Sequence, residues 1–372
     1  MGVKVPMADL VGQYRKLKDE LDGAALSVLG GGGYILGPTV EKFERSLAAF
    51  CGAKFAFGVG NGTDALLVSL KALGVGPGDE VITPPFTFVA TVETVALLGA
   101  TPVFADIDPH TFNLDPERVS EKITAKTKAI VPVHLFGQLA DMEALQALAD
   151  AHKIPLLADG AQAIGATRSG KKLGSFADVT TLSFYPTKNL GAAGDGGAIL
   201  TDDDALAERI QLFRFHGSGG GYLYKEIGVC TRLDAIQAAL LSVKLPHLDA
   251  WNAERRDNAC FYRSALDGVD GLTLPICQPQ NEHVYHQFTV RVLGGRRDAL
   301  KAFLAERGIS TGVFYPQALH LAPAYAYLGA GPGDFPESER ACDEVLSLPI
   351  VPELTRDQLD LAVAGIREFF QK

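Results

Sequence analysis

Residues 55–73, FAFGVGNGTDALLVSLKAL, decide the fold because they place a buried strand, a glycine-rich turn and an amphipathic helix in immediate succession. The same alternation of short apolar runs with helical patterns continues to about residue 200. Strands that alternate with helices form mostly parallel sheets with helices on both faces. The expected fold is therefore α/β, with seven strands at residues 55–59, 80–83, 102–105, 129–133, 154–158, 179–183 and 197–201.

The pattern changes after residue 201. Helices are predicted at residues 205–213, 233–243, 251–266, 297–307 and 356–370, and a strand at 284–292. Pro246 interrupts the helical pattern, because a proline cannot donate the backbone hydrogen bond that a helix requires. We therefore predict a large domain over residues 1–246, which includes the N-terminal segment, and a smaller α+β domain over residues 247–372.

Composition excludes several classes of protein. The chain has 372 residues, 34 Lys plus Arg and 44 Asp plus Glu, which gives a net charge of −10. Surfaces that bind nucleic acid or anionic membranes need clustered cations, so neither partner is expected. The five cysteines form no C-x-x-C pair, and the N-terminus has no apolar run typical of a signal peptide. No apolar stretch is long enough to span a membrane, so the expected location is the cytoplasm.

The turn at residues 58–66, GVGNGTDAL, is the first candidate binding site. Free N–H groups at a helix N-terminus bind anions, and Thr63 could add a hydroxyl donor. The alternative is a tight turn in which Thr63 or Asp64 caps the helix. A nicotinamide site fits poorly because the pattern is G-x-G-x-x-T, and a Walker loop would need a following Gly-Lys-Ser/Thr.

Two further motifs follow predicted strands, at the edge of the sheet where ligands gather. In residues 156–162, LLADGAQ, Asp159 comes directly after an apolar run, although it could instead cap a helix. In residues 182–191, LSFYPTKNLG, Lys188 lies between Pro186 and Gly191. Burial lowers the pKa of a lysine and frees its amine for Schiff-base chemistry; the alternative is a surface-loop lysine. An anion site, an acid and a lysine together are the groups that pyridoxal phosphate requires.

At this point the sequence resembles a known family, the DegT-type sugar aminotransferases. These are fold-type-I pyridoxal-phosphate enzymes that aminate nucleotide-linked keto sugars. The resemblance runs from YILGP (residues 34–38) to LSLP (346–349). The other shared motifs are NGTDAL (61–66), PFTFVAT (85–91), DGAQ (159–162), SFYPTKNLG (183–191) and RLD (232–234).

The resemblance implies a role for each matching residue of the cofactor site. Lys188 would form the Schiff base and would move the proton between Cα of the amino acid and C4′ of the cofactor. Asp159 would keep the ring nitrogen protonated, because an opposite charge stabilises the cation. The remaining roles are a hydrogen bond to the ring hydroxyl from Gln162, stacking on the ring by Phe88, and phosphate binding by Gly62, Thr63 and Ser183.

The resemblance also implies a homodimer with shared active sites and an amino-acid donor, L-glutamate. Arg232 would contact the anionic part of the sugar nucleotide, and His216, Tyr315 and His320 match positions near the substrate. Segments 34–37, 61–64 and 315–320 are closer to aminotransferases that act at C3 of the sugar, with C4 as the alternative. Cys230 departs from the family, which has asparagine here to reach the cofactor phosphate of the neighbouring subunit. A thiol is a weak donor, so that contact is in doubt.

Other functions remain as alternatives. Some relatives are sugar dehydratases with histidine in the lysine position, and Lys188 argues against that reaction. A regulatory protein that only binds the cofactor is a further alternative, but it would not need an intact pair of Lys188 and Asp159. The motif His283-x-x-His286 alone is a weak metal signal, and both side chains are expected to be packed or solvated, so no metal is predicted.

Overall fold

The computed structural model describes residues 2–371, and all seven predicted strands form. A four-stranded sheet has the order β1-β9-β8-β5, and a three-stranded sheet has the order β3-β2-β4. Parallel bridges between Ile130 and Leu156 and between Val133 and Asp159 join the two into one layer. The strands are β1 (Phe55–Val59), β2 (Glu80–Thr83), β3 (Thr101–Phe104), β4 (Thr127–Ile130), β5 (Leu157–Asp159), β8 (Val179–Ser183) and β9 (Gly197–Thr201).

The layer is mostly parallel, as predicted. Strand β9 runs antiparallel to both of its neighbours, β1 and β8, whereas β5 pairs with β8, and β2 with β3 and β4, in parallel. Strands β5 and β8 therefore end at the same edge of the layer. The loop that returns from β8 to β9 starts at this edge and carries Lys188.

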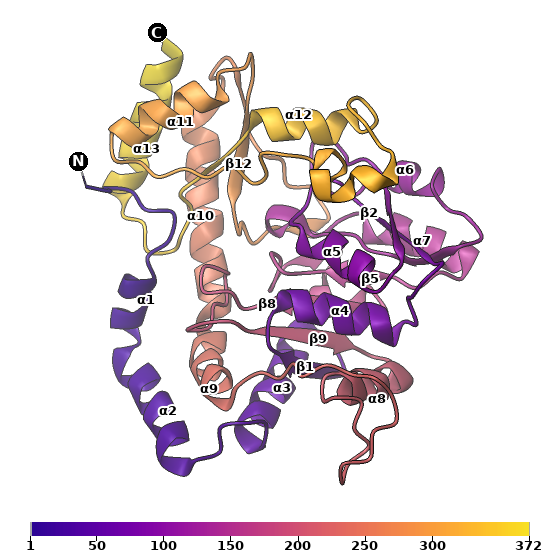
Figure 1. Ribbon diagram of the computed structural model, residues 1–372. Coiled ribbons are helices and arrows are strands. Elements are labelled where there is room, and N and C mark those ends of the chain that lie inside the picture. Colours follow the sequence, from indigo (N-terminus) through magenta and orange to yellow (C-terminus); the bar gives the residue numbers. More distant parts are fainter. Residues whose placement is uncertain (1, 372) are drawn as a thin grey trace.

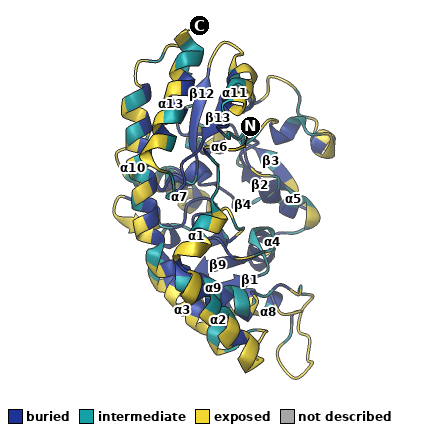
Figure 2. Ribbon diagram, turned by 90° about the vertical axis from the view of Figure 1, so that its left-hand side faces the viewer, coloured by how far each residue is buried: buried dark blue, intermediate teal, exposed yellow. Residues whose placement is uncertain are grey.

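Helices cover both faces of the layer (Figures 1 and 2). Leu182 and Leu200 point into a core that includes Phe43, whereas Val179 and Ile199 point into a second core that includes Val68. This division follows from the alternation of side chains along a strand. The helices of this part are α1 (Leu10–Lys16), α2 (Lys18–Gly31), α3 (Pro38–Cys51), α4 (Gly62–Ala72), α5 (Ala90–Leu97), α6 (Pro116–Ser120), α7 (Met142–His152), α8 (Asp204–Phe213) and α9 (Ala235–Lys244).

A separate core gathers the C-terminal elements. It contains Tyr262, Phe288 and Ile366 and also takes in Val5, which forms a parallel bridge with Ile309. Helix α10 contributes Leu248 and Trp251 to the core under α3 and Tyr262 to this one. The predicted domain boundary at residue 246 stays a prediction. The elements are α10 (Leu248–Leu266), β10 (Leu272–Thr273), β12 (Phe288–Val292), α11 (Arg297–Glu306), α12 (Pro336–Glu344), β13 (Val345–Leu348) and α13 (Arg356–Gln371).

Residues 215–230 form an extended hairpin, which we call the arm and which projects from the bottom of the molecule in Figure 1. Antiparallel bridges join Phe215 to Cys230 and Ser218 to Tyr224. A small sheet elsewhere contains β6 (Thr167–Arg168), β7 (Lys171–Lys172) and β11 (Asn281–Glu282). None of the helices within residues 2–371 has the length and apolar character of a membrane span.

Candidate active site

Lys188 lies in a tight turn directly after β8. Its backbone N–H donates to the carbonyl of Tyr185 at 2.8 Å, and Ala192 N–H donates to the carbonyl of Phe184 at 2.8 Å. The lysine side chain is partly buried. Desolvation lowers the pKa of Lys188 from 10.5 to about 8, although the negative charge of Asp159 opposes the shift. About a tenth of the amine is therefore uncharged at pH 7, far more than for an ordinary lysine, and the uncharged amine is the form that reacts with a carbonyl group.

Asp159 ends β5 and is only 5% exposed. Its carboxylate accepts hydrogen bonds from the hydroxyl of Thr91 at 2.8 Å and from the backbone N–H of Ala161 at 3.1 Å. Burial raises the pKa of Asp159, while these donors and the charge of Lys188 oppose the rise. The carboxylate thus meets two neutral donors and lies within electrostatic reach of the lysine.

Gln162 and Tyr315 form the next part of the site. The backbone N–H of Phe136 donates to Oε1 of Gln162 at 2.6 Å, which fixes the orientation of the amide. Its Nε2 therefore faces the hydroxyl of Tyr315 at 3.3 Å. The Tyr315 ring lies 6.1 Å from that of Phe88, whose side chain is 54% exposed. The exposed ring of Phe88 is free to stack on a planar ligand.

The N-terminus of α4 meets the end of β8. A Cβ atom at Gly62 would lie 2.8 Å from Cβ of Ser183 and 3.2 Å from its Oγ, so only glycine allows this contact. Asn61 caps the helix by accepting from the backbone N–H of Asp64 at 2.8 Å. Thr63 is in the first turn of the same helix. The structure therefore brings the helix start at Gly62 and Thr63 to Ser183, and the role of these residues toward a phosphate stays a prediction.

Arg232 and Cys230 lie on either side of Thr231, which is joined to the start of α4. The Thr231 hydroxyl accepts from Gly60 N–H at 2.8 Å and donates to Asp64 at 2.6 Å. Arg232 Nη2 is 3.0 Å from Sγ of Cys230. The sequence analysis did not identify Thr231, although the residue lies next to the RLD motif.

His216 and His320 are not placed with the Lys188 cluster. His216 is exposed at the base of the arm, where its ring contacts Phe215. His320 is buried, and its contacts are a 3.1 Å hydrogen bond to Glu339 and the rings of Phe104 and Phe335. Their roles toward a substrate stay predictions.

Two residues near Lys188 and Asp159 were not assigned a role from the sequence. Thr91 belongs to the PFTFVAT motif, but its bond to Asp159 depends on how α5 packs against β5. His286 donates to or accepts from Asn189, the residue after the lysine, across 3.1 Å. His286 belongs to the H-x-x-H motif, whose spacing does not indicate a contact with Asn189. Within residues 2–371 there is no group of three or more potential metal ligands.

The residues present fit pyridoxal phosphate. A buried carboxylate is costly without a cation, and a protonated ring nitrogen at Asp159 would supply one. The Nε2 group of Gln162 can donate to a ring hydroxylate, because its Oε1 is already occupied by Phe136. The N–H groups at the start of α4 and the Ser183 hydroxyl suit a phosphate. The donors, the acid and the amine thus match the three polar ends of the cofactor.

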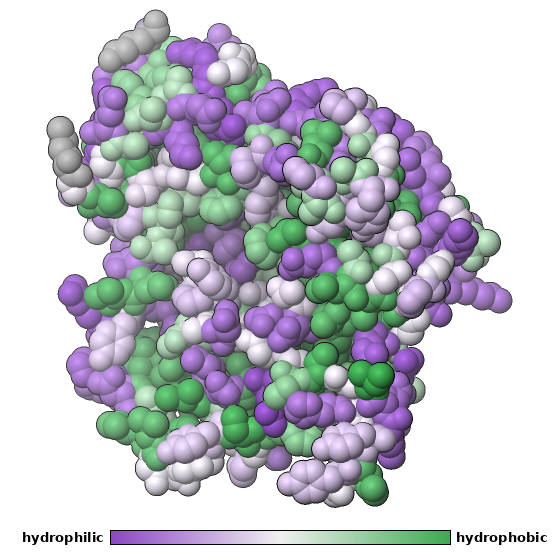
Figure 3. Space-filling model, in the orientation of Figure 1, coloured by the Kyte–Doolittle hydropathy of each residue, from purple (hydrophilic) through white to green (hydrophobic). Residues whose placement is uncertain are grey.

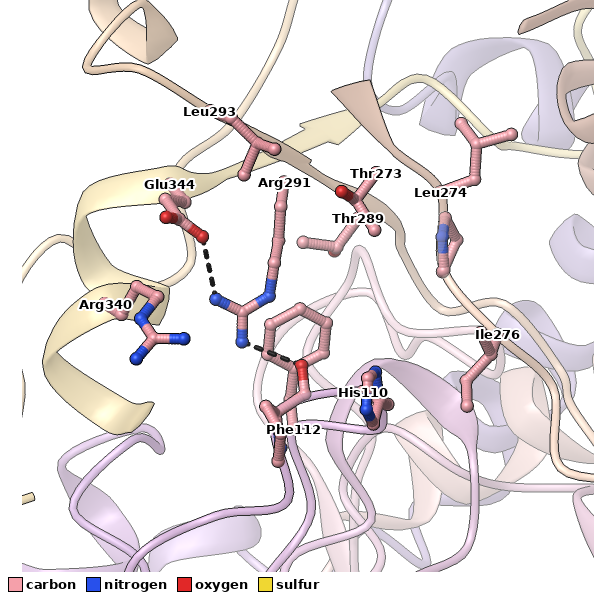
Figure 4. A pocket seen from close by; sticks show the side chains of 12 residues that line it. His110, Phe112, Thr273, Leu274, Ile276, Thr289, Arg291, Leu293, Arg340 and Glu344 are labelled. Atoms are coloured by element: carbon pink, nitrogen blue, oxygen red, sulfur yellow. Dashed lines mark hydrogen bonds and ion pairs between the residues drawn. The ribbon is translucent and has the colours of Figure 1, made fainter. Parts of the chain in front are cut away.

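A separate pocket of about 260 Å³ lies between the C-terminal sheet and the loop at residues 109–112 (Figure 4). Arg291 lies in the wall of this pocket. Its guanidinium is already engaged within the protein, because it donates to Glu344 at 2.9 Å and to the carbonyl of Pro109 at 2.8 Å. Its guanidinium also stacks over the ring of Phe112. None of the residues that line this pocket belongs to the predicted cofactor or substrate site.

Comparisons with known proteins show what the whole chain is similar to. A profile of the DegT/DnrJ/EryC1/StrS aminotransferase family matches residues 15–367. The chain is 49% identical over 371 residues to a "Pleiotropic regulatory protein" of Geobacillus stearothermophilus, covering 99% of both chains. It is 45% identical over 371 residues to the "dTDP-3-amino-3,4,6-trideoxy-alpha-D-glucose transaminase" of Streptomyces venezuelae, covering 99% of this chain and 97% of that one. The crystal structure of DesV from S. venezuelae superposes with a TM-score of 0.97 at 44% identity, covering 100% of both chains.

Proposed function

The chain belongs to the DegT/DnrJ/EryC1/StrS aminotransferase family, and from that premise we propose that it moves an amino group from L-glutamate to C3 of a nucleotide-linked keto sugar. Aminotransferases of this family depend on pyridoxal phosphate. When bound, the cofactor supplies an electron sink that makes a proton on a neighbouring carbon removable.

The single observation that carries the proposal is the pairing of a buried acid with a desolvated amine at one edge of the sheet. Asp159 is 5% exposed, and the pKa of Lys188 is lowered to about 8. In the proposed reaction Asp159 holds the proton on the ring nitrogen. Lys188 removes a proton from Cα of the amino acid and delivers it to C4′ of the cofactor, and it reverses this transfer on the sugar. Gln162, Phe88, Gly62, Thr63 and Ser183 hold the cofactor.

The choice of C3 is supported by the name of the S. venezuelae relative, a transaminase that forms a 3-amino sugar. Arg232 is proposed to contact the nucleotide phosphates, and Tyr315 the sugar. The test is a panel of UDP-, GDP- and dTDP-linked 3-keto and 4-keto sugars, each incubated with ¹⁵N-glutamate and analysed by mass spectrometry. The proposal predicts ¹⁵N in a 3-amino product together with 2-oxoglutarate. Amination of 4-keto substrates alone would contradict the assignment to C3.

We propose a homodimer with shared active sites, because the arm carries exposed apolar side chains. Tyr222, Leu223 and Ile227 of the arm are 88%, 71% and 86% exposed, and such apolar groups on a projecting hairpin are typical of an interface. Figure 3 shows hydrophobic residues gathered in the lower half of this face, toward the arm. Cys230 of the arm stands where the family has an asparagine that reaches the cofactor phosphate of the neighbouring subunit. In the proposed dimer, cofactor affinity would therefore be lower unless another donor compensates.

A regulatory role is the second candidate, because the G. stearothermophilus relative carries the name of a regulatory protein. The two functions differ in what glutamate does to the protein. A transaminase releases 2-oxoglutarate from glutamate and loses its yellow colour, whereas a protein that only binds the cofactor keeps the colour. The cytoplasm as the location of the protein stays a prediction from the sequence.

A further inference from the structure

Two buried amide groups and a partly buried imidazole form a chain of hydrogen bonds behind Lys188. Asn252 Nδ2 on α10 donates to the carbonyl of Ile164 at 3.1 Å. Asn189 Nδ2 donates to Oδ1 of Asn252 at 2.8 Å and to the carbonyl of Val284 at 3.1 Å. Oδ1 of Asn189 then meets Nδ1 of His286 at 3.1 Å. The chain links α10 and the segment before β12 to the residue that follows Lys188.

The direction of every bond in this chain is fixed by backbone carbonyls, which can only accept. The carbonyls of Ile164 and Val284 require that the amide nitrogens of Asn252 and Asn189 face them. The atom of Asn189 that faces His286 is therefore its Oδ1, which can only accept a hydrogen bond. His286 must carry a hydrogen on Nδ1, and a neutral ring then has a bare lone pair on Nε2.

Positive charges and burial keep the His286 ring neutral. Lys188, in the loop after β8, lies within electrostatic reach of the ring, and Arg255 on α10 donates to the carbonyls of Tyr285 and His286 at 3.2 and 3.4 Å. Together with desolvation, which is the largest cause, these charges hold the pKa of His286 well below its usual value of 6.5. Within residues 2–371 no side chain or backbone group hydrogen-bonds to Nε2 of His286. This Nε2 is also not one of the fully buried side-chain atoms that lack a hydrogen-bond partner.

We propose that His286 is a positioning residue for Lys188: its Nδ1–H holds Asn189, and its uncharged Nε2 is the acceptor offered to the protonated lysine amine. This inference rests on the proposed role of Lys188. It assigns His286 two tasks at the lysine turn, of which Asn252 shares the first, because Asn189 Nδ2 donates to its Oδ1. Nδ1 fixes the turn through Asn189, and Nε2 favours the ammonium form after a proton has been taken up.

The first test is the protonation state of the ring in the unmodified, cofactor-free chain. Two-bond ¹H–¹⁵N correlation spectra of ¹⁵N-histidine-labelled protein show which ring nitrogen carries the proton, and His286→Gln assigns the signal. His134 and His283 serve as internal controls, because Nδ1 of each accepts from a backbone N–H, at 3.2 and 2.9 Å, so each carries its hydrogen on Nε2. We expect His286 alone of these three to be protonated at Nδ1 at pH 7. A hydrogen on Nε2, or an imidazolium at pH 7, would overturn the proposal.

The second test measures Lys188 itself in cofactor-free protein, by the pH dependence of its labelling with an amine-reactive reagent and peptide mass spectrometry. His286→Phe removes both ring nitrogens, whereas His286→Asn places an amide N–H near the position of Nδ1–H. With Phe we expect the midpoint of the Lys188 curve to fall by about half a pH unit, which makes labelling at pH 7 about threefold faster. With Asn we expect the order of the turn to be kept, seen as wild-type protection in hydrogen exchange of the Lys188 N–H, which donates to the carbonyl of Tyr185, and we expect this protection to be lost with Phe.

An unchanged or higher midpoint in His286→Phe would overturn the acceptor role, and unchanged protection of the Lys188 N–H in that variant would overturn the anchoring role. Neither readout needs a sugar substrate or glutamate. A failure of sugar amination with both results as expected would therefore count against the proposed function alone.

Discussion

At Asp159 a carboxylate is held inside the protein by a threonine hydroxyl and one backbone N–H. Burial raises the pKa of this acid, so the protein groups around it do not fully compensate its negative charge. A cationic ring nitrogen would complete this compensation, which is why this residue, more than any other, indicates the cofactor. The neighbouring amine of Lys188 is desolvated for the same reason and titrates at about pH 8.

Asp159→Asn is expected to reduce kcat by about 10²–10³-fold, because the amide cannot hold a proton on the ring nitrogen. The unfolding free energy should not fall, since a buried charge is removed and the amide oxygen can still accept from Thr91. Steady-state 2-oxoglutarate release and denaturant unfolding measure the two quantities. Asp178→Asn is the matched control, because Asp178 accepts from Leu156 N–H at 2.8 Å and lies just before β8, at the other edge of the sheet. Equal losses of kcat in both variants would contradict the role of Asp159.

Lys188→Met should change the stability of the cofactor-free chain in a pH-dependent manner. The pKa of Lys188 is about 8 in the folded chain and 10.5 in its ordinary environment, so the unfolded chain binds more protons between these values. The stability of the wild type relative to the variant therefore rises as the pH increases from 8 to 10.5, and the variant is relatively most stable below pH 8. Urea unfolding of both proteins between pH 7 and 10 tests this. A difference that does not depend on pH would show that the amine is not desolvated.

The sequence placed Lys188, Asp159 and Gln162 at one edge because each follows a buried apolar run. It could not reveal the bonds of Thr91 to Asp159 or of His286 to Asn189. Those contacts join segments that are 68 and 97 residues apart, and they depend on how α5 and the segment before β12 pack. A local sequence pattern carries no information on contacts between segments so far apart, so these supporting residues could not be predicted from it.

At the scale of elements, the site exists because α4 begins where β8 ends. Periodicity located both elements to within a few residues, since β8 is buried on both faces of the sheet and α4 buries the apolar face that packs on it. The motif alone did not show that Gly62 touches Ser183, because that contact depends on β9 lying antiparallel between β1 and β8. Apolar runs predict strands well but do not give the direction of each strand.

Gly62→Ala tests this close approach. The new methyl group would lie 2.8 Å from Cβ of Ser183, so the helix start must move away from β8. We expect a loss of about 1–3 kcal/mol in unfolding free energy, with a weaker affinity for the cofactor phosphate. Thermal unfolding and equilibrium binding of pyridoxal phosphate measure the two effects. The control is Gly76→Ala, where a Cβ would meet nothing within 4 Å; similar effects of both substitutions would refute the close contact as the cause.

At the scale of the whole molecule, a net charge of −10 coexists with a site built for phosphates. The two are compatible because the proposed site would use backbone N–H groups, hydroxyls and Arg232 rather than a broad basic surface. In a monomer, the apolar side chains of the arm would stay exposed to water, and the proposed dimer accounts for them. The sequence could not identify the arm as projecting, because glycines and aromatic residues alternate there without a helix or strand period.

Leu223→Asp on the arm is expected to weaken the dimer, because a buried leucine contributes about 1.5–3 kcal/mol and a charge would lose it. The dissociation constant should rise by about tenfold or more, and aminotransferase activity should fall at dilution. Analytical ultracentrifugation measures the constant. Leu97→Asp on α5 is the control, since both leucines are 71% exposed. A wild-type chain that sediments as a monomer at all concentrations would contradict the proposed assembly.

The most direct test of the central claim is to locate the cofactor on the chain. Protein loaded with pyridoxal phosphate is reduced with borohydride, which makes the bond to a lysine permanent, and its peptides are mapped by mass spectrometry. The account predicts one cofactor adduct per chain, on Lys188, and none in Lys188→Met. An adduct on another lysine, or none on loaded wild-type protein, would contradict it.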